Sequence, residues 1–222
     1  LLWTVINMVL QIGIGFMIAV GLNSTVLKKT SRIYKTLLML PWAMPAYISI
    51  LLWRVGMFNT EFGILNKCLT LLGFNKVDFL GNNVIAFCSC LALNLWMALP
   101  FMISTIDGAL QSVDSSLYES ATLDGAGFWV SMRDITIPAI KPIIAPAAVM
   151  TTFITFKQFD IVYLLTQQRG YMTGANFNTV ITYAHQNAFV SNNYGLSSAV
   201  SMLLFVIIIL FSLITNRSLR EE

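Results

Sequence analysis

Four polar side chains lie inside long apolar stretches of the chain, where their chemistry suits a solute rich in hydroxyl groups. Thr151, Thr155 and Gln158 are spaced i, i+4 and i+7, so a helix would present them on one face. Asn94 lies in another apolar stretch, with Phe101 two turns further on. Amides and hydroxyls can donate and accept hydrogen bonds, and an aromatic ring packs on the apolar side of a sugar. Interhelical hydrogen bonding that only holds a bundle together is the alternative, and both interpretations stay open here.

Lys157 and Asp160 form a second candidate for chemistry, because they are oppositely charged, three residues apart and inside an apolar stretch. On a helix they would face each other. Mutual neutralisation is one interpretation. Proton coupling, as in a secondary transporter, is the other. Asp107 lies near the end of a different apolar stretch, and we assign no functional role to it.

The chain carries no visible set of nucleophile, base and oxyanion donors in one place, so an enzyme is not indicated and we expect no catalytic residues. The three cysteines, Cys68, Cys88 and Cys90, are odd in number, and the last two point away from each other on a helix. We interpret them as small buried thiols rather than as a disulfide framework or a metal site. His185 stands alone, and we expect it to be solvated or interfacial.

Composition indicates an integral membrane protein. The 222 residues are 57% hydrophobic and only 10% charged, against about 25% charged in soluble domains, and the mean hydropathy is +0.75. A net charge of +3 without runs of Lys and Arg excludes a nucleic-acid partner. The sequence begins with Leu1 inside an apolar stretch, so we expect a fragment of one membrane domain (residues 1–222) whose N-terminus is missing.

Five stretches have the roughly 20 apolar residues that a membrane span needs. The fold class that they predict is an all-α, polytopic helix bundle. Prolines interrupt the second stretch at Pro41 and Pro45, and we expect a kink there, either a hinge or a static bend. The predicted spans are Trp3–Leu22, Thr36–Val55, Val84–Leu110, Ile143–Leu165 and Leu196–Thr215.

The distribution of positive charge predicts the orientation of these spans. One set of connections (23–35, 111–142 and the tail after 215) carries eight Lys and Arg residues, and the other set (54–83 and 166–195) carries four. The positive-inside rule therefore places the first set in the cytoplasm. Short helices are expected in both external connections, including one over 178–190 that lies on the membrane with Ile181, Ala184 and Ala188 on one side.

The polar stretch 114–142, called here the 114–142 loop, is longer than a simple connection needs. Ser116 and Glu119 are spaced as a capping box for a helix over Leu117–Asp124. Gly125 suits the left-handed position that ends a helix. A second helix, Gly127–Thr136, should end before Pro138, because the residue before a proline avoids the α region. Capping and turning the chain is one interpretation of these residues, and a contact surface for a soluble partner is the other.

The spacing in this loop resembles the signature of permease subunits of binding-protein-dependent ABC importers, and nearly the whole chain resembles their five-helix core. The family pattern is Glu-Ala-Ala, two residues, Asp-Gly-Ala, then Ile-x-x-Pro, and only Ser120 departs from it. The flanking segments 40–45, 94–96, 117–119 and 194–196 resemble the carbohydrate branch and its maltose-type permeases. The resemblance implies that the loop contacts the ATPase through Glu119, Ser120, Ala121, Asp124, Gly125, Ala126, Ile135 and Pro138.

The resemblance also implies partners and location. Members form a sugar pathway with a second permease subunit, above a dimer of ATPase subunits and below an extracytoplasmic sugar-binding protein. They span the bacterial inner membrane several times, in contact with its lipid. The loop helix, called the coupling helix, enters a cleft on the ATPase. This chain has no G-x-x-x-x-G-K-[ST] run, so ATP and Mg²⁺ are expected on the ATPase partner and no cofactor on this chain.

Within the maltose-type branch, the resemblance implies a set of residues that line the sugar pathway, although only Asn94 clearly keeps the family's residue type. A permease for amino acids or peptides remains an alternative within the same superfamily. The ion-coupled transporter that would use Lys157 and Asp160 remains an alternative outside it. The implied pathway residues are Trp42, Ala46, Asn94, Met97, Ala98, Phe101, Thr151, Ile154, Thr155 and Gln158.

Overall fold

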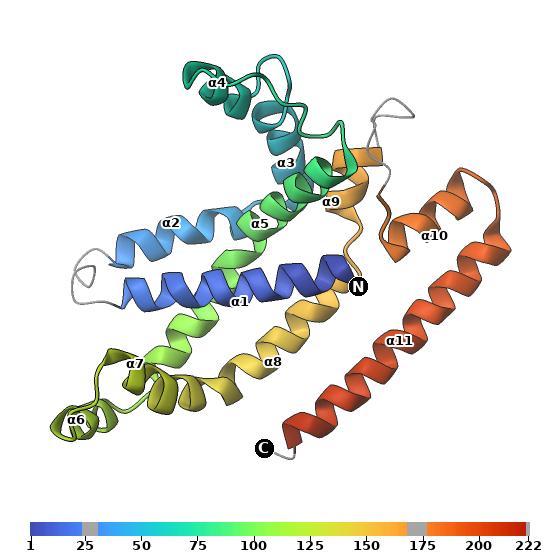
Figure 1. Ribbon diagram of the computed structural model, residues 1–222. Coiled ribbons are helices and arrows are strands. Elements are labelled where there is room, and N and C mark those ends of the chain that lie inside the picture. The colour runs from blue at the N-terminus through green and yellow to red at the C-terminus, as the bar shows by residue number, and fades with distance from the viewer. Residues whose placement is uncertain (24–30, 168–176, 221–222) are drawn as a thin grey trace.

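The computed structural model describes residues 1–23, 31–167 and 177–220, and in them every regular element is a helix (Figure 1). Three short segments, η1, η2 and η3, have π-helical rather than α-helical hydrogen bonding. In chain order the elements are α1 (Leu2–Leu22), α2 (Ser31–Ala43), α3 (Ala46–Leu51), η1 (Leu52–Met57), α4 (Ile64–Leu71), α5 (Asn83–Gln111), α6 (Ser115–Leu123), α7 (Phe128–Ser131), η2 (Met132–Thr136), α8 (Ile137–Phe156), α9 (Asp160–Val162), η3 (Tyr163–Gln167), α10 (Val180–Phe189) and α11 (Tyr194–Arg220).

Within the described residues, four helical segments are long and apolar enough to cross a membrane. Each overlaps one of the predicted spans, so the first, third, fourth and fifth are confirmed as apolar helices of spanning length. The last of them has no fully buried residue, and most of its surface is exposed. It still packs against α8 through the rings of Phe211 and Phe153, and against α10 through a hydrogen bond from the Ser197 hydroxyl to the Ala184 carbonyl. The four segments are Leu2–Leu22, Asn83–Gln111, Phe128–Thr166 and Tyr194–Leu213.

The second predicted span is two helices rather than one kinked helix. Ile33–Ala43 and Ala46–Met57 meet at 94°. Pro45 causes the break, because its ring keeps the preceding Met44 out of the α region and Pro45 itself is extended, with ψ 132°. Pro41 remains inside α2. The location of the interruption was predicted correctly, but the sequence did not predict a right-angled turn.

The helix that contains the fourth span begins earlier than predicted, because the chain does not stop being helical at Pro138. This proline is in the first turn of α8, where its missing N–H is tolerated. The π-helical η2 precedes it directly, and the Ile137 N–H reaches the Met132 carbonyl. Such a wider turn accommodates a break in the usual hydrogen-bond ladder. Pro142 and Pro146 also lie inside α8, so the helix continues through all three prolines.

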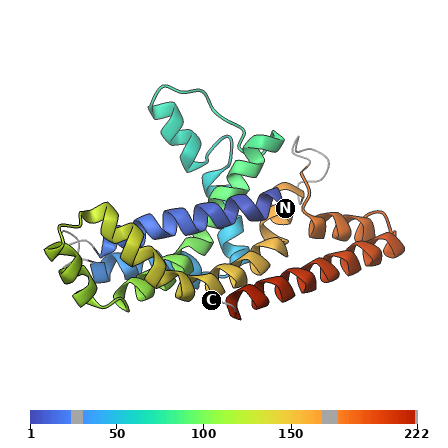
Figure 2. The ribbon, with the colours of Figure 1, turned by 60° about the horizontal axis from the view of Figure 1, so that its bottom comes forward.

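The centre of the bundle is the contact between α1 and α5, which run side by side in the same direction. Along this contact, Asn7 meets Asn94 and Gly15 meets Met102. At the end of α1, Asn23 meets Asp107. Gly15 permits the close approach, because a Cβ there would lie 3.1 Å from the Met102 side chain. Figure 2 shows the long helices in one layer, with α4 standing out on one side.

Helices occur in both connections that were predicted to contain one. In the 57–82 connection, the buried Asn66 amide donates to the carbonyls of Asn59 and Val77, and its oxygen accepts from the Val77 N–H. These bonds hold α4 against the returning chain. In the 178–190 segment α10 forms as expected, with Ala184 and Ala188 buried and Ile181 partly buried.

His185, which was predicted to be solvated or interfacial, is partly buried in the structure. Its ring packs among the rings of Phe159, Tyr163 and Phe189, with centroid separations of 4.8–4.9 Å. The side chain therefore joins α10 to the α9–η3 segment. Phe189 lies one turn further along α10, but Phe159 and Tyr163 come from a separate segment of the chain, so the sequence gave no sign of the whole cluster.

Candidate functional site

The 114–142 loop folds into a compact unit at one end of the molecule (Figure 1). Its first helix, α6, begins at Ser115 and is capped by Asp114, whose carboxylate accepts a hydrogen bond from the Ser116 N–H at 2.9 Å. The predicted capping box of Ser116 and Glu119 is therefore wrong: Ser116 already lies in the first turn. The carboxylate two residues earlier competes better for the free N–H groups, because it is charged and they are at the positive end of the helix dipole.

This cap predicts an acid-sensitive helix. The hydrogen bond from the Ser116 backbone, followed by one from its side chain, lowers the pKa of Asp114. A carboxyl whose folded pKa lies below its unfolded pKa of about 3.9 stabilises the fold above that pH, and the contribution disappears as the pH falls through the folded value. We expect hydrogen-exchange protection of α6 to decrease in acid for the natural chain. Asp114→Asn should retain protection without this pH dependence, and Asp114→Ala should lose it at every pH.

Gly125 ends α6 in the left-handed conformation that was predicted, with φ +78°. The Ala126 N–H bonds the Ala121 carbonyl at 2.8 Å and the Gly125 N–H bonds the Thr122 carbonyl at 3.1 Å. This pair of bonds is a Schellman motif, which satisfies the last carbonyls of the helix. Three residues of the predicted contact set, Ala121, Gly125 and Ala126, thus form one rigid turn.

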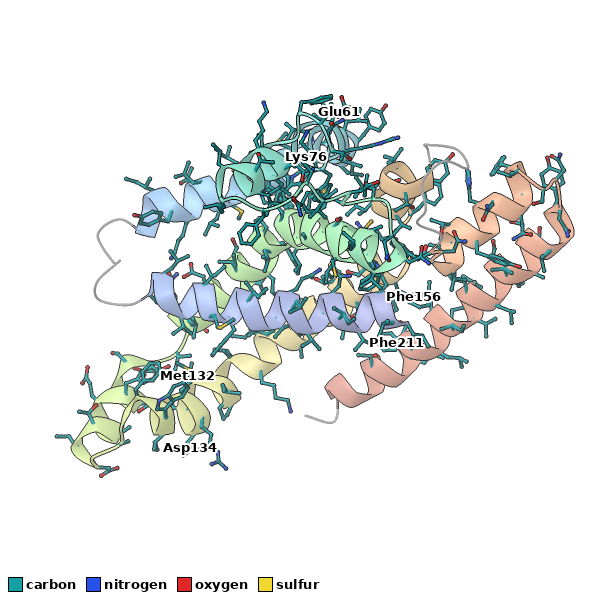
Figure 3. The ribbon with its side chains drawn as sticks, turned by 45° about the horizontal axis from the view of Figure 1, so that its top comes forward. Glu61, Lys76, Met132, Asp134, Phe156 and Phe211 are labelled. Carbon is teal, nitrogen blue, oxygen red and sulfur yellow. The ribbon has the colours of Figure 1, made fainter. Side chains whose placement is uncertain are left out.

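A hydrogen bond of 2.9 Å between the hydroxyls of Tyr118 and Thr136 joins the two limbs of the loop. Thr136 is buried and also donates to the Ser131 carbonyl at 3.2 Å. Because α8 continues directly from η2, this bond connects α6 to the beginning of a long apolar helix. Figure 3 marks this second limb by Met132 and Asp134, well separated from the 57–82 connection marked by Glu61 and Lys76.

The tip of the loop is apolar and exposed, which sequence reasoning did not single out. Leu123 is 89% exposed, Trp129 79% and Phe128 62%. Three large apolar side chains that avoid the bundle are typical of a contact surface for another protein. Among the predicted contact residues, Glu119, Ser120, Asp124 and Pro138 are exposed, whereas Ala121, Ala126 and Ile135 are partly buried. In the sequence, the adjacent Phe128 and Trp129, next to Gly127, were the available sign of this exposed surface.

The predicted pathway residues are only partly brought together. Asn94 is 3% exposed and donates its amide to the Asn7 oxygen, and Asn7 in turn donates to the Trp3 carbonyl. In this conformation the Asn94 amide is therefore used between helices α1 and α5. Trp42, at the end of α2, is 60% exposed, and Met97 and Phe101 are partly buried on α5.

Two of the three polar residues assigned to one helix face do lie on α8, and the third does not. Thr151 and Thr155 are buried, and the Thr151 hydroxyl donates to the Ala147 carbonyl of its own helix. Gln158 follows the end of α8 at Phe156, so the expectation of a shared face fails for it. Its side-chain oxygen is buried without a protein partner. Among the described residues, no hydrogen bond joins Asn94 to these three side chains.

The same helix end separates Lys157 from Asp160. Lys157 is the C-cap of α8, while Asp160 begins α9. Both side chains are exposed, and the ion pairs found in the described residues do not include them. The prediction that they face each other on one helix is therefore wrong, because helical spacing applies only while the helix is continuous.

An apolar crevice of about 470 Å³ lies between α1, α2 and α5. Trp96 and Leu99 contribute from α5, Pro41 and Leu38 from α2, and Ile18 from α1.

The described residues contain no group of three His, Cys, Asp or Glu side chains placed to hold a metal. Cys90 is buried as expected, but Cys68 and Cys88 are exposed, which corrects the prediction of three buried thiols.

The buried polar groups that sequence reasoning missed are Asp107 and the two amides of α1. Asp107 binds side chains from three places, Asn23, Lys35 and Gln111. Gln11 is fully buried, and both of its polar atoms lack a protein partner. Polar residues in an apolar stretch were the signal for all of them, but the sequence could not tell which of them meet.

Residues 11–220 match the family of binding-protein-dependent transport system inner membrane components. The chain belongs to this family. The match confirms the resemblance first suggested by the spacing in the 114–142 loop, and it agrees with the apolar helices of spanning length. This permease chain is thus a multi-pass component of an inner membrane.

Two curated relatives are similar over nearly the whole permease chain. The trehalose/maltose transport system permease protein of Thermococcus litoralis is 32% identical over 209 residues, which are 94% of this chain and 68% of the relative. The galactooligosaccharides transport system permease protein of Bacillus subtilis is 32% identical over an alignment of 229 positions that covers 99% of this chain. This chain spans about half, 54%, of the length of that second relative.

The architecture is also that of a solved ABC transporter. The crystal structure of a bacterial alginate transporter, in complex with an alginate pentasaccharide-bound periplasmic protein, superposes with a TM-score of 0.83 at 23% identity. The superposition covers 99% of this chain and 75% of that chain. At this level of identity the likeness shows the fold, and it confirms the predicted type of permease core.

Proposed function

We propose that this chain is the permease subunit of an ATP-driven, binding-protein-dependent importer of a sugar, with an oligosaccharide such as a maltodextrin as its substrate. The observation that carries the proposal is the 32% identity to a trehalose/maltose permease over 94% of the chain. The galactooligosaccharide relative supports the same class of substrate. Both relatives favour a sugar over the amino acids or peptides of the alternative interpretation.

The 114–142 loop is the proposed contact with the ATPase dimer. Its Schellman turn at Gly125, its exposed apolar tip and its direct continuation into α8 suit a rigid element that is held in a cleft. The proposed contact residues are those of the family signature, from Glu119 to Pro138. ATP and Mg²⁺ would be held by the partner, since the chain has no phosphate-binding loop of the P-loop type. A second permease subunit and an extracytoplasmic sugar-binding protein complete the proposed assembly.

The proposed sugar pathway lies between α2, α5 and α8. Trp42 and Phe101 offer aromatic faces there, Met97 offers a flexible apolar side chain, and Thr151 and Thr155 offer hydroxyls. The apolar crevice beside Trp96 leaves room for movement of α2. Asn94 and Gln158 would bind sugar only after a rearrangement, because the first is bonded to Asn7 and the second lies beyond the helix end.

Reconstitution tests the proposed function against both alternatives. The chain, its partner permease, the ATPase and the binding protein are placed in proteoliposomes, and uptake of labelled maltose, maltotriose, trehalose and an amino-acid mixture is measured. We expect sugar uptake that requires ATP on the ATPase side and survives a protonophore. Uptake that continues without ATP and collapses with the protonophore would establish ion coupling instead. Uptake of amino acids but of no sugar would overturn the substrate class.

A further inference from the structure

The carboxylate of Asp107 binds three side chains in the described part of the bundle. Lys35 Nζ lies 2.7 Å from Asp107 Oδ2, Asn23 Nδ2 donates to Oδ1 at 2.7 Å, and Gln111 Nε2 donates to Oδ2 at 2.8 Å. The Asp107 side chain is 12% exposed and that of Lys35 is 32% exposed. An ion pair this sheltered is much less screened by salt than one at the surface.

These partners come from the two ends of the same connection. Asn23 caps the end of α1, and Lys35 lies in the second turn of α2. One carboxylate on α5 therefore holds the end of one helix and the beginning of the next. Gln111, one turn further along α5, holds the carboxylate in its orientation. Asn23 and Gln111 also keep the charge hydrogen-bonded if Lys35 is removed.

The same carboxylate lies close to the 114–142 loop along the chain. Helix α5 ends at Gln111, and α6 begins at Ser115. From Asp107 to the end of α5 the helix rises by only about 6 Å. A movement of the loop is thus a movement of the end of α5, and Asp107 is fixed to that end.

The other end of helix α2 adjoins a sharp corner of the chain. The helix ends at Ala43, and the chain turns by 94° before α3. The Met44 N–H still reaches the Pro41 carbonyl at 3.4 Å, but Pro45 has no N–H with which to continue the hydrogen-bond ladder across the corner. Trp42, next to the corner, is exposed and is one of the proposed pathway residues. An element that is held at one end and jointed at the other can swing as a rigid body.

We propose that Asp107 is a positioning residue for transport: through Lys35 it ties α2 to the end of α5, so that displacement of the 114–142 loop swings α2 about the Met44–Pro45 corner. This inference rests on the proposed function, because the displacement comes from the ATPase. The ion pair transmits the displacement of the 114–142 loop to α2, which lies beside the proposed sugar pathway. Removing the link should leave ATP hydrolysis running without moving sugar.

The test uses the complete complex in proteoliposomes and measures maltose or maltotriose taken up per ATP hydrolysed, together with assembly by pull-down of the ATPase. Asp107→Asn removes one charge of the pair, and Lys35→Met removes the other while keeping an apolar stem. Coupling between sites typically corresponds to about 5–150-fold. We therefore expect the uptake-to-hydrolysis ratio to fall at least about fivefold, with assembly unchanged. The exchanged pair Asp107→Lys/Lys35→Asp should recover part of the ratio.

Glu61→Gln and Lys67→Met are the matched controls, since they remove the same charges from exposed positions in the 57–82 connection. Both should retain the natural ratio. The proposal is overturned if Lys35→Met and Asp107→Asn keep the natural ratio in a working complex, or if uptake, hydrolysis and assembly fall together in both variants. Absence of ATP-driven sugar uptake in the natural complex would overturn the proposed function as well, so the two failures are distinguishable.

Discussion

Replacement of Gly125 by valine is expected to weaken ATPase association by about 5–150-fold, because it strains the turn that shapes the proposed contact surface. Gly125 has φ +78°, where a β-branched residue is a steric outlier. Strain of this kind costs about 1–3 kcal/mol. The turn then either opens, which breaks the Ala126–Ala121 hydrogen bond, or binds in a less favourable geometry. Pull-down of the ATPase from membranes measures the effect.

Two controls separate backbone strain from the added side chain. Gly125→Asn should bind nearly as well as the natural chain, because asparagine tolerates the left-handed region. Gly127→Val adds the same side chain two residues later, where φ is −80° and no other group lies within 4 Å of a new Cβ. It should also retain the ATPase. Natural levels of association in Gly125→Val would refute a role for this turn in the contact.

Truncation of Asn94 to alanine is expected to destabilise the isolated permease by about 1–2 kcal/mol. The substitution removes the hydrogen bond that joins α1 to α5 and leaves the Asn7 oxygen buried without its donor. A buried acceptor without a partner costs about 1–3 kcal/mol, and hydrogen bonds between membrane helices contribute about 0.6 kcal/mol on average. Unfolding in mixed detergent micelles, compared with the natural chain, gives the difference in free energy.

A double-mutant cycle with Asn7→Ala then distinguishes packing from sugar contact. If the pair acts as a unit, the double variant should be hardly less stable than either single variant. Asn187→Ala serves as the control, because its amide bonds the Tyr183 carbonyl within α10. Natural stability of Asn94→Ala combined with a higher KM for sugar uptake would contradict the packing role and assign Asn94 to the sugar pathway.

Much of the architecture was predictable because it depends on local composition. Long apolar stretches identify the helices from Leu2, Asn83 and Tyr194 wherever they pack, since a membrane span must satisfy its own backbone hydrogen bonds. The left-handed turn at Gly125 was predictable for a similar reason: only the residue itself and its immediate neighbours decide it. Proline at position 45 likewise marked the place where the second span is interrupted.

Other features were decided by context beyond the local pattern. The helix continues through Pro138, because this proline lies in the first turn of α8, directly after the π-helical η2, where its missing N–H is tolerated. The helix then stops at Phe156, which removes Gln158 from the face of Thr151 and Thr155. Helical spacing predicted that face correctly only up to the point where the helix ends.

The sequence by itself determined that this is a helical membrane permease with a polar loop that turns at a glycine, because hydropathy, proline and glycine act over a few residues. Only the tertiary structure decided where the polar groups go. Asn7 meets Asn94 across 87 positions, and Asp107 meets Asn23 across 84. Such pairs depend on the relative placement and rotation of two helices, which side-chain packing sets along their whole length. The chain order of the residues carries no direct record of that placement.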